Sequence, residues 1–224
     1  KGVQSPYQVT YGLNGNNFTN EAPMNVGNYV VHVSIGNVYC TGNITITDNP
    51  MSLKASDYEG TYDGKAHSAS ITVLSPENAT INYSNDGVNF SAENPSFTDV
   101  GNYTVYYKIE CPNYQTVSGT LNVTITPKEI SSVNFSELTQ PQGNHSFDIS
   151  VKCSTTGIKN CLVRWIADDT EMTTHASFNK EYQCLITFYP DTTGYRFSED
   201  ISKDNVSLSG SNPSSIKKNS DGSI

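Results

Sequence analysis

The sequence lacks long apolar runs, helix-forming segments and an excess of positive charge. No apolar run approaches the roughly 20 residues that a membrane-spanning helix needs, so we expect no membrane insertion within this segment. No window shows an apolar period of 3.6 residues or a run of strong helix formers, which favours an all-β fold. With 13 basic and 22 acidic residues, the formal net charge of −9 repels a phosphate backbone. We therefore expect no nucleic-acid partner.

The motifs that usually mark an active site are also missing. The chain contains no H-E-x-x-H, no G-x-S-x-G and no glycine-rich phosphate loop, and its four histidines are scattered. The acidic residues Asp168, Asp169 and Glu171 offer oxygen ligands for calcium but lack the spacing of a calcium loop, so a charged turn is the better interpretation. We therefore expect a protein that is not an enzyme, with no catalytic residue, cofactor or metal.

What the sequence does have is the composition of short strands and tight turns. Its 224 residues include 16 glycines and 10 prolines, and the length allows two or three small domains. The clearest strand lies within residues 97–109, where Tyr103, Val105, Tyr107 and Ile109 alternate with residues on the other face. We expect tandem immunoglobulin-like β-sandwich modules arranged as an elongated rod.

Tyrosines at the start of such strands predict the corners of these sandwiches. In immunoglobulin-like domains a corner tyrosine bonds through its hydroxyl to backbone a few residues upstream. Tyr103, in Asp99-x-Gly101-x-Tyr103, fits this position, and Tyr29 repeats it after Gly27 in the N-terminal part. A repeated corner indicates a repeated domain. Tyr182, two residues before Cys184, is a third candidate corner.

Short proline-bearing segments divide the chain into three modules. Residues 50–127 form a complete module, which begins at Pro50 and ends at Pro127, because proline interrupts a strand ladder. Residues 1–49 match the later part of that module but have no counterpart of its first two strands. A sandwich that lacks two strands exposes an edge and an apolar face, where we expect disorder, self-association or pairing with other sequence.

Within the complete module we expect strands at 52–55, 70–74, 81–84, 101–110 and 119–126, with a short piece at 89–90. Together, several segments resemble the MBG-type repeats of bacterial surface proteins: Leu53-Lys54-Ala55, Tyr62-Asp63-Gly64-Lys65, Tyr83-Ser84-Asn85-Asp86-Gly87, residues 97–109, Pro112-Asn113-Tyr114 and residues 121–126. The resemblance covers residues 50–127 almost end to end and the N-terminal module from about Val9. It implies β-sandwich repeats strung in series on a secreted or wall-anchored protein, and its motifs specify a fold rather than a ligand.

Residues 128–224 carry a different alternating pattern. Its strands include residues 147–153, residues 161–165 around Trp165, and residues 206–208, and the whole is similar to a second sandwich domain of bacterial surface proteins. Two interpretations of residues 209–224 stay open. They are either the approach to a further strand of this domain or a flexible polar tail.

The five cysteines include no C-x-x-C pair and are odd in number, so they indicate neither a zinc site nor a compartment. Cys153, Cys161 and Cys184 alternate onto inward faces, and we interpret them first as small buried thiols. The alternative is a disulfide between Cys153 and Cys184 beside Trp165, as in antibody domains.

For function, the resemblance implies a non-catalytic stalk or adhesion segment of a bacterial cell-surface or secreted protein. The alternative is an accessory carbohydrate-binding region of a secreted carbohydrate-active enzyme, with Tyr106 and Tyr195 as the candidate ligand platform. The simpler explanation for these tyrosines is cross-strand packing. We expect an extracellular monomer whose ligand is a surface protein or a glycan, which the sequence does not identify.

Overall fold

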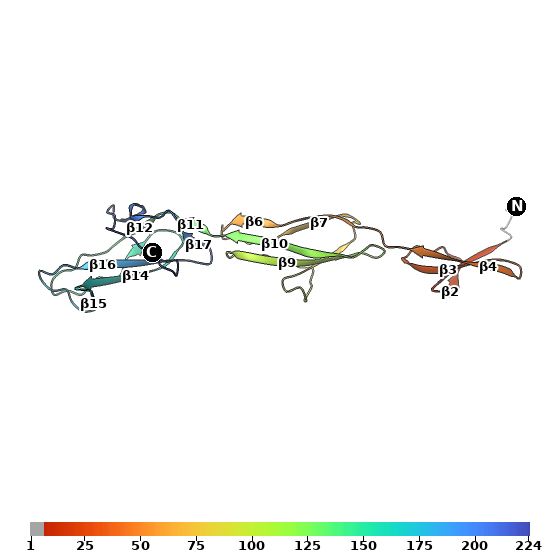
Figure 1. Ribbon diagram of the computed structural model, residues 1–224, viewed down its shortest axis with the longest axis horizontal. Coiled ribbons are helices and arrows are strands. Elements are labelled where there is room, and N and C mark those ends of the chain that lie inside the picture. Colours follow the sequence, from red (N-terminus) through yellow and green to blue (C-terminus); the bar gives the residue numbers. More distant parts are fainter. Residues whose placement is uncertain (1–6) are drawn as a thin grey trace. The chain divides into compact units, whose positions relative to one another are not determined.

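The computed structural model describes residues 7–224 and is all-β (Figure 1). In this part of the chain the only helical element is one 3-10 turn, η1 (Lys203–Asn205). The chain divides into two compact units. The first comprises the residues up to 57 with 68–95 and 104–122, and the second comprises 58–67, 96–103 and 123–224. The expected fold class of several β-sheets is therefore confirmed.

In the first unit the N-terminal residues form an antiparallel sheet of order β2–β1–β3–β4. Its strands are β1 (Gln8–Leu13), β2 (Asn16–Thr19), β3 (Gly27–Ile35) and β4 (Val38–Ile46). Asn14 and Gly15 have φ values of 50° and 77° between β1 and β2, which suits a two-residue hairpin turn. Gly36, with φ of 59°, serves the turn between β3 and β4.

This N-terminal sheet is exposed at positions where the repeat places a core. Ile35 and Ile44 are 58% and 41% exposed, whereas their counterparts Ile109 and Val123 are fully buried. In the complete module three further strands, at residues 52–56, 58–61 and 70–75, precede the matching segment, and none stands among residues 7–46 in that role. The exposures agree with the uncovered apolar face that the repeat pattern predicts.

The following residues contain six strands: β5 (Ser52–Ser56), β6 (Tyr58–Thr61), β7 (Ser70–Ser75), β8 (Thr80–Ser84), β9 (Gly101–Glu110) and β10 (Val117–Thr126). β5 pairs with β7, and a separate sheet has the order β6–β10–β9–β8. Val105 and Ile109 on β9 and Val123 on β10 are completely buried, because alternate residues of each strand face the core.

The strand β6 was not expected from the sequence, and the strand expected at 89–90 does not form. β6 pairs in parallel with β10, with Tyr58 opposite Val123, and such distant pairing leaves no local pattern. Near Phe90 only a single bridge joins Tyr83 to Ser91. The backbone N–H groups of Val88 and Asn89 donate to the Asp86 carboxylate there, so they are not available for hydrogen bonds to a neighbouring strand.

The C-terminal residues of the second unit build three small sheets. Their strands are β11 (Lys128–Ile130), β12 (Val133–Ser136), β13 (Lys152–Cys153), β14 (Ile158–Ala167), β15 (Thr170–Met172), β16 (Gln183–Pro190), β17 (Tyr195–Phe197) and β18 (Val206–Leu208). The sheets have the orders β11–β17, β13–β12–β18 and β15–β14–β16. A buried cluster that includes Val133, Phe135, Phe188 and Val206 joins strands of different sheets, which is the arrangement of a sandwich core.

The strand predicted over residues 147–153 is wrong except for its last two residues, which form β13. Ile149 is 74% exposed, although alternation placed it inward. Backbone groups in this segment form hydrogen bonds with side chains instead of with a neighbouring strand. The Asp148 carboxylate accepts the backbone N–H groups of Thr139 and Ser150, and the Asp148 backbone carbonyl accepts the Trp165 indole N–H at 2.6 Å. These bonds satisfy the backbone without a ladder.

The C-terminal residues do not behave as a free tail. Ile224 is 8% exposed and belongs to the same buried cluster as Phe188. The two residues exchange backbone hydrogen bonds, at 2.9 Å from the Phe188 N–H and 3.2 Å from the Ile224 N–H. The last residue is therefore packed on the core of this module.

Candidate functional site

Tyr29 and Tyr103 have matching surroundings in the two repeated segments. The Tyr29 hydroxyl donates to the Asn25 carbonyl at 2.9 Å, and the Tyr103 hydroxyl donates to the Asp99 carbonyl at 3.1 Å. Each tyrosine stands two residues after the glycine that begins its strand, and each ring covers that glycine. Both hydroxyls therefore tie the start of a strand to the turn before it.

Tyr182 makes a different contact. Its hydroxyl accepts the backbone N–H of Ser177 at 2.7 Å, so it acts as an acceptor rather than a donor. Its ring meets Phe147 edge-on, with centroids 5.1 Å apart. Tyr182 closes a loop onto the core before β16, which is a related but separate role from that of Tyr29 and Tyr103.

Within the first unit, Asn113 links the loop between β9 and β10 to residues near the N-terminal sheet. Its side-chain oxygen accepts the Val26 N–H at 2.9 Å, and its amide nitrogen donates to the Asn25 side chain at 3.1 Å. Its carbonyl accepts the Asn49 N–H at 2.9 Å. One residue thus holds both the turn before β3 and the segment after β4. Its φ of 67° suits asparagine.

Within the second unit, the chain passes from β10 to β11 with Pro127 alone between the two strands. The Lys128 N–H donates to the Gly194 carbonyl at 2.9 Å, and β11 then pairs in parallel with β17. On the other side, the Val100 N–H donates to the Thr193 carbonyl at 2.8 Å. The loop at 191–194 therefore contacts both the corner segment before β9 and the start of β11.

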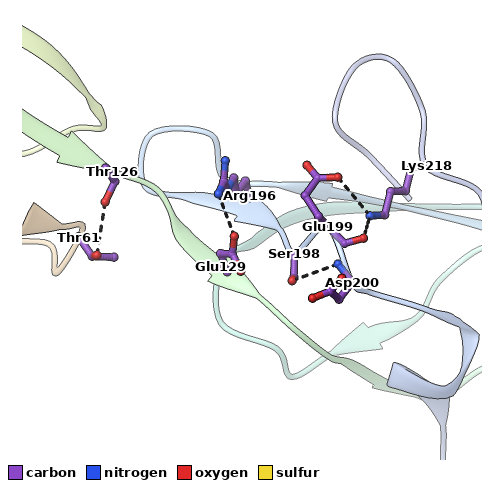
Figure 2. Close-up of polar contacts among 8 residues, drawn as sticks. All are labelled: Thr61, Thr126, Glu129, Arg196, Ser198, Glu199, Asp200 and Lys218. Carbon is purple, nitrogen blue, oxygen red and sulfur yellow. Dashed lines mark hydrogen bonds and ion pairs between the residues drawn. The ribbon is translucent and has the colours of Figure 1, made fainter.

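Aromatic packing and polar contacts reinforce the junction between the β10–β11 passage and the loop at 191–194. The rings of Tyr62 and Tyr195 meet edge-on at 5.4 Å, and a methyl group added to the buried Gly194 would overlap the Tyr62 ring. Figure 2 shows the ion pair between Arg196 and Glu129 at 2.9 Å across β17 and β11. It also shows a hydrogen bond between the hydroxyls of Thr126 and Thr61 at 3.3 Å.

Tyr106, one candidate of the ligand platform, is 36% exposed and lies against the turn at Gly87. The turn is held by Asp86, whose carboxylate accepts the backbone N–H of Asn89 at 2.8 Å and the Ser84 hydroxyl at 2.7 Å. These contacts hold the pKa of Asp86 far below its usual range, and the backbone N–H of Asn89 is the largest cause. Tyr106 therefore offers a partly exposed ring on a well-braced turn.

Tyr195, the other candidate, is half-buried rather than open. Its ring packs against Tyr62 and lies over Gly157, leaving no room for a side chain at that position. Structural packing therefore accounts for the Tyr195 ring, whereas the exposed part of Tyr106 has no such explanation.

All five cysteines are free thiols, and Cys153 and Cys184 are not joined. Cys184 lies opposite Trp165 and is exposed, although alternation placed it inward. It shares a face with Ile186 and Phe188, but exposure rises along β16 toward the start of the strand. Cys161 lies opposite Phe188 instead, next to Cys153 in the buried region.

The acidic residues after β14 form a tight turn. Asp168 and Asp169 have φ values of 48° and 57°, and the Lys180 ammonium lies 3.0 Å from the Asp168 carboxylate. Among residues 7–224 no cluster of three or more His, Cys, Asp or Glu side chains is arranged to hold a metal ion. In the same residues no helix is long and apolar enough to cross a membrane.

The junction contacts of Asn113 and Gly194 were missed by the sequence analysis. A signal existed for Asn113, because Pro112-Asn113-Tyr114 belongs to the segments that resemble a repeat family, and asparagine favours a left-handed backbone. For Gly194 the Gly-Tyr-x-Phe pattern was visible, but its contact with Tyr62 depends on a residue far away in sequence.

Comparison with known proteins gives one family. Residues 52–128 match the model of the MBG domain, and no curated protein matches the chain. MBG domains are non-enzymatic repeats that occur in surface proteins. The match covers strands β5 to β10 and the first residue of β11. Residues 52–128 are thus an MBG-type repeat of the kind that the sequence resemblance indicated.

Proposed function

We propose that this chain is a non-catalytic stalk or adhesion segment of a bacterial cell-surface or secreted protein. In this proposal three immunoglobulin-like sandwich modules, residues 1–49, 50–127 and 128–224, follow one another as an elongated rod outside the cell. The first two are MBG-type and the third is a sandwich of another type. The MBG match over residues 52–128 supports a surface-protein setting.

The observation that carries the proposal is how the chain passes from one module to the next. Pro127 alone separates β10 from β11, and Lys128 and Val100 bond to the loop at 191–194. At the other passage, Asn113 holds Asn25, Val26 and Asn49. Short links with several hydrogen bonds restrict bending between modules. A spacer needs this stiffness, and a flexible linker does not have it.

The corner tyrosines give the modules their individual shape in this proposal. Tyr29 and Tyr103 each fix the entry of a long strand by a hydroxyl-to-carbonyl bond. Ladder hydrogen bonds and small cores hold the rest of each module, while the polar outward faces and the net charge of −9 keep the rod soluble.

Sedimentation velocity of the intact chain tests the proposal. The expected result is a single monomeric species whose frictional ratio is clearly above that of a compact protein of the same mass. A compact monomer, or a stable oligomer, would count against an extended stalk.

A second function has one supporting observation, the partly exposed ring of Tyr106 over the braced turn at Asp86. Aromatic rings on rigid supports suit sugar stacking. A glycan array separates the two functions. Sugar retention that is lost in Tyr106→Ala and kept in the Tyr39→Ala control would favour an accessory carbohydrate-binding region. No retention by either protein favours the stalk.

A further inference from the structure

The two thiols of Cys153 and Cys161 lie on facing sheets of the C-terminal module. Cys153 is on β13, in the sheet β13–β12–β18, and pairs directly with Phe135. Cys161 is on β14, in the sheet β15–β14–β16, and pairs directly with Phe188. Residues directly opposite each other in an antiparallel pair project to the same face. Each cysteine therefore shares a face with its phenylalanine.

The two phenylalanines meet between the sheets. Their ring centroids are 5.2 Å apart, and both belong to the buried cluster that Cys153 and Cys161 also contact. The thiols therefore flank a closed aromatic contact from opposite sheets. Burial, with the charge of Cys153 as a smaller cause, raises the pKa of Cys161 to about 11.

The segment between the two cysteines is fixed at several points. The Ser154 N–H donates to the Asn134 carbonyl at 3.1 Å, and the Asn134 N–H donates to the Thr155 hydroxyl at 2.9 Å. Gly157, with φ of 91°, lies beneath the Tyr195 ring. A short fixed loop keeps both thiols in place and reduces the rearrangement that a cross-link would need.

We infer that Cys153 and Cys161 form a disulfide that joins the two sheets of this module when the protein meets a low-molecular-weight disulfide oxidant. One cysteine thiolate attacks the oxidant and releases one small thiol, giving a mixed disulfide. The second cysteine thiolate attacks the protein sulfur of that mixed disulfide and releases the second small thiol. The protein loses two protons and two electrons, and the oxidant takes them up to become two thiols. This inference is independent of the proposed stalk function.

The pairing differs from the Cys153–Cys184 bridge that the antibody-like pattern suggested. Cys184 is exposed and lies opposite Trp165, four positions along β14 from Cys161. At roughly 3.4 Å per residue, Cys184 is too far along the sheet to replace Cys161 beside Cys153.

The test uses the intact chain carrying Cys40→Ser and Cys184→Ser, which removes the two exposed thiols. The protein is treated with oxidised glutathione at mildly alkaline pH, alkylated without reduction and digested with trypsin. Cleavage after Lys152, Lys159 and Arg164 places the two cysteines on separate peptides. We expect residues 153–159 and 160–164 to appear as one linked species about 2 Da lighter than the two peptides together, and to separate on reduction.

The oxidised protein is also expected to melt about 5–10 °C higher than the reduced one, as judged by Trp165 fluorescence. Three alkylated cysteines after oxidant treatment would overturn the inference, as would a link from either peptide to Cys111 or a stable glutathione adduct. The Cys111→Ser variant is the matched control, and it should form the same link.

Discussion

The hydroxyls of Tyr29 and Tyr103 perform the same task at the starts of two long strands. Each bonds to the carbonyl four residues upstream, and each ring lies over the glycine that opens the strand. Tyr103 also stacks on Phe97, with ring centroids 4.1 Å apart. The ring supplies packing and the hydroxyl supplies direction, so these two contributions can be separated by mutation.

Removing the Tyr103 hydroxyl should therefore lower the stability of the fold. For Tyr103→Phe we expect a loss of about 1 kcal/mol, since the ring stays and one hydrogen bond is lost. Urea unfolding followed by circular dichroism should report the loss. Tyr106→Phe is the matched control, and an equal loss in that variant would contradict the corner role.

Several aspartates act as local braces, and their charge makes the fold sensitive to acid. The Ser150 N–H, then the Thr139 hydroxyl, hold the pKa of Asp148 below its usual value. Asp86 is lowered in pKa by the same kind of contact. A carboxyl group with a depressed pKa in the folded state stabilises the fold fully above its unfolded value, near 3.9, and loses this effect as pH falls through the folded pKa.

We therefore expect the melting temperature to vary little between pH 7 and 5 for these groups and to fall as pH drops below about 4. Asp148→Asn should lower the melting temperature at pH 7 and flatten the acid-side slope, as measured by Trp165 fluorescence. Glu77→Gln, at an exposed position, should leave both unchanged. An unaltered slope in Asp148→Asn would show that the Asp148 charge does not brace the loop.

At the scale of elements, the loop between β16 and β17 holds the junction because backbone and ring approach closely. Gly194 is buried beneath Tyr62, and its carbonyl accepts the Lys128 N–H. For Gly194→Ala we expect a loss of about 1–3 kcal/mol from overpacking, measured by urea unfolding. Gly42→Ala, where a methyl group meets open space, should change stability by less than about 0.5 kcal/mol. Similar values for both variants would refute the close approach.

The loop between β9 and β10 depends on one asparagine side chain. Asn113→Gly keeps a residue that accepts φ of 67° but removes both side-chain hydrogen bonds. We expect faster hydrogen exchange at the Val26 N–H, with exchange inside β9 unchanged. Equal protection at Val26 in both proteins would mean that the side-chain contact does not hold this turn.

Elements with a local pattern could be predicted from sequence, and elements fixed by distant partners could not. β9 appears over Gly101–Glu110 as predicted, because alternation and the Gly-x-Tyr start are both local. β6 was missed because it exists through parallel pairing with β10. The strand predicted over 147–153 does not form over most of that range. The Asp148 carboxylate accepts the Ser150 N–H there, and the Trp165 indole N–H donates to the Asp148 carbonyl. The exposure of Cys184 was not predicted, because alternation indicates the face of the sheet on which a residue lies but not whether other elements cover that face.

At the scale of the whole molecule, the sequence resemblance anticipated the MBG repeat, which residues 52–128 match. The contacts on which the proposed stalk depends lie at Asn113 and Gly194. The proposed stalk therefore requires those short, hydrogen-bonded passages to keep successive modules extended in solution.

Small-angle X-ray scattering of the intact chain measures that extension directly. Three modules end to end, each about as long as a ten-residue strand, give a rod of about 100 Å and a radius of gyration of about 30 Å. A compact chain of this length has a radius of gyration of about 17 Å. We expect a radius of gyration near 30 Å with the signature of folded modules. A value near 17 Å, or the profile of a flexible chain, would contradict it.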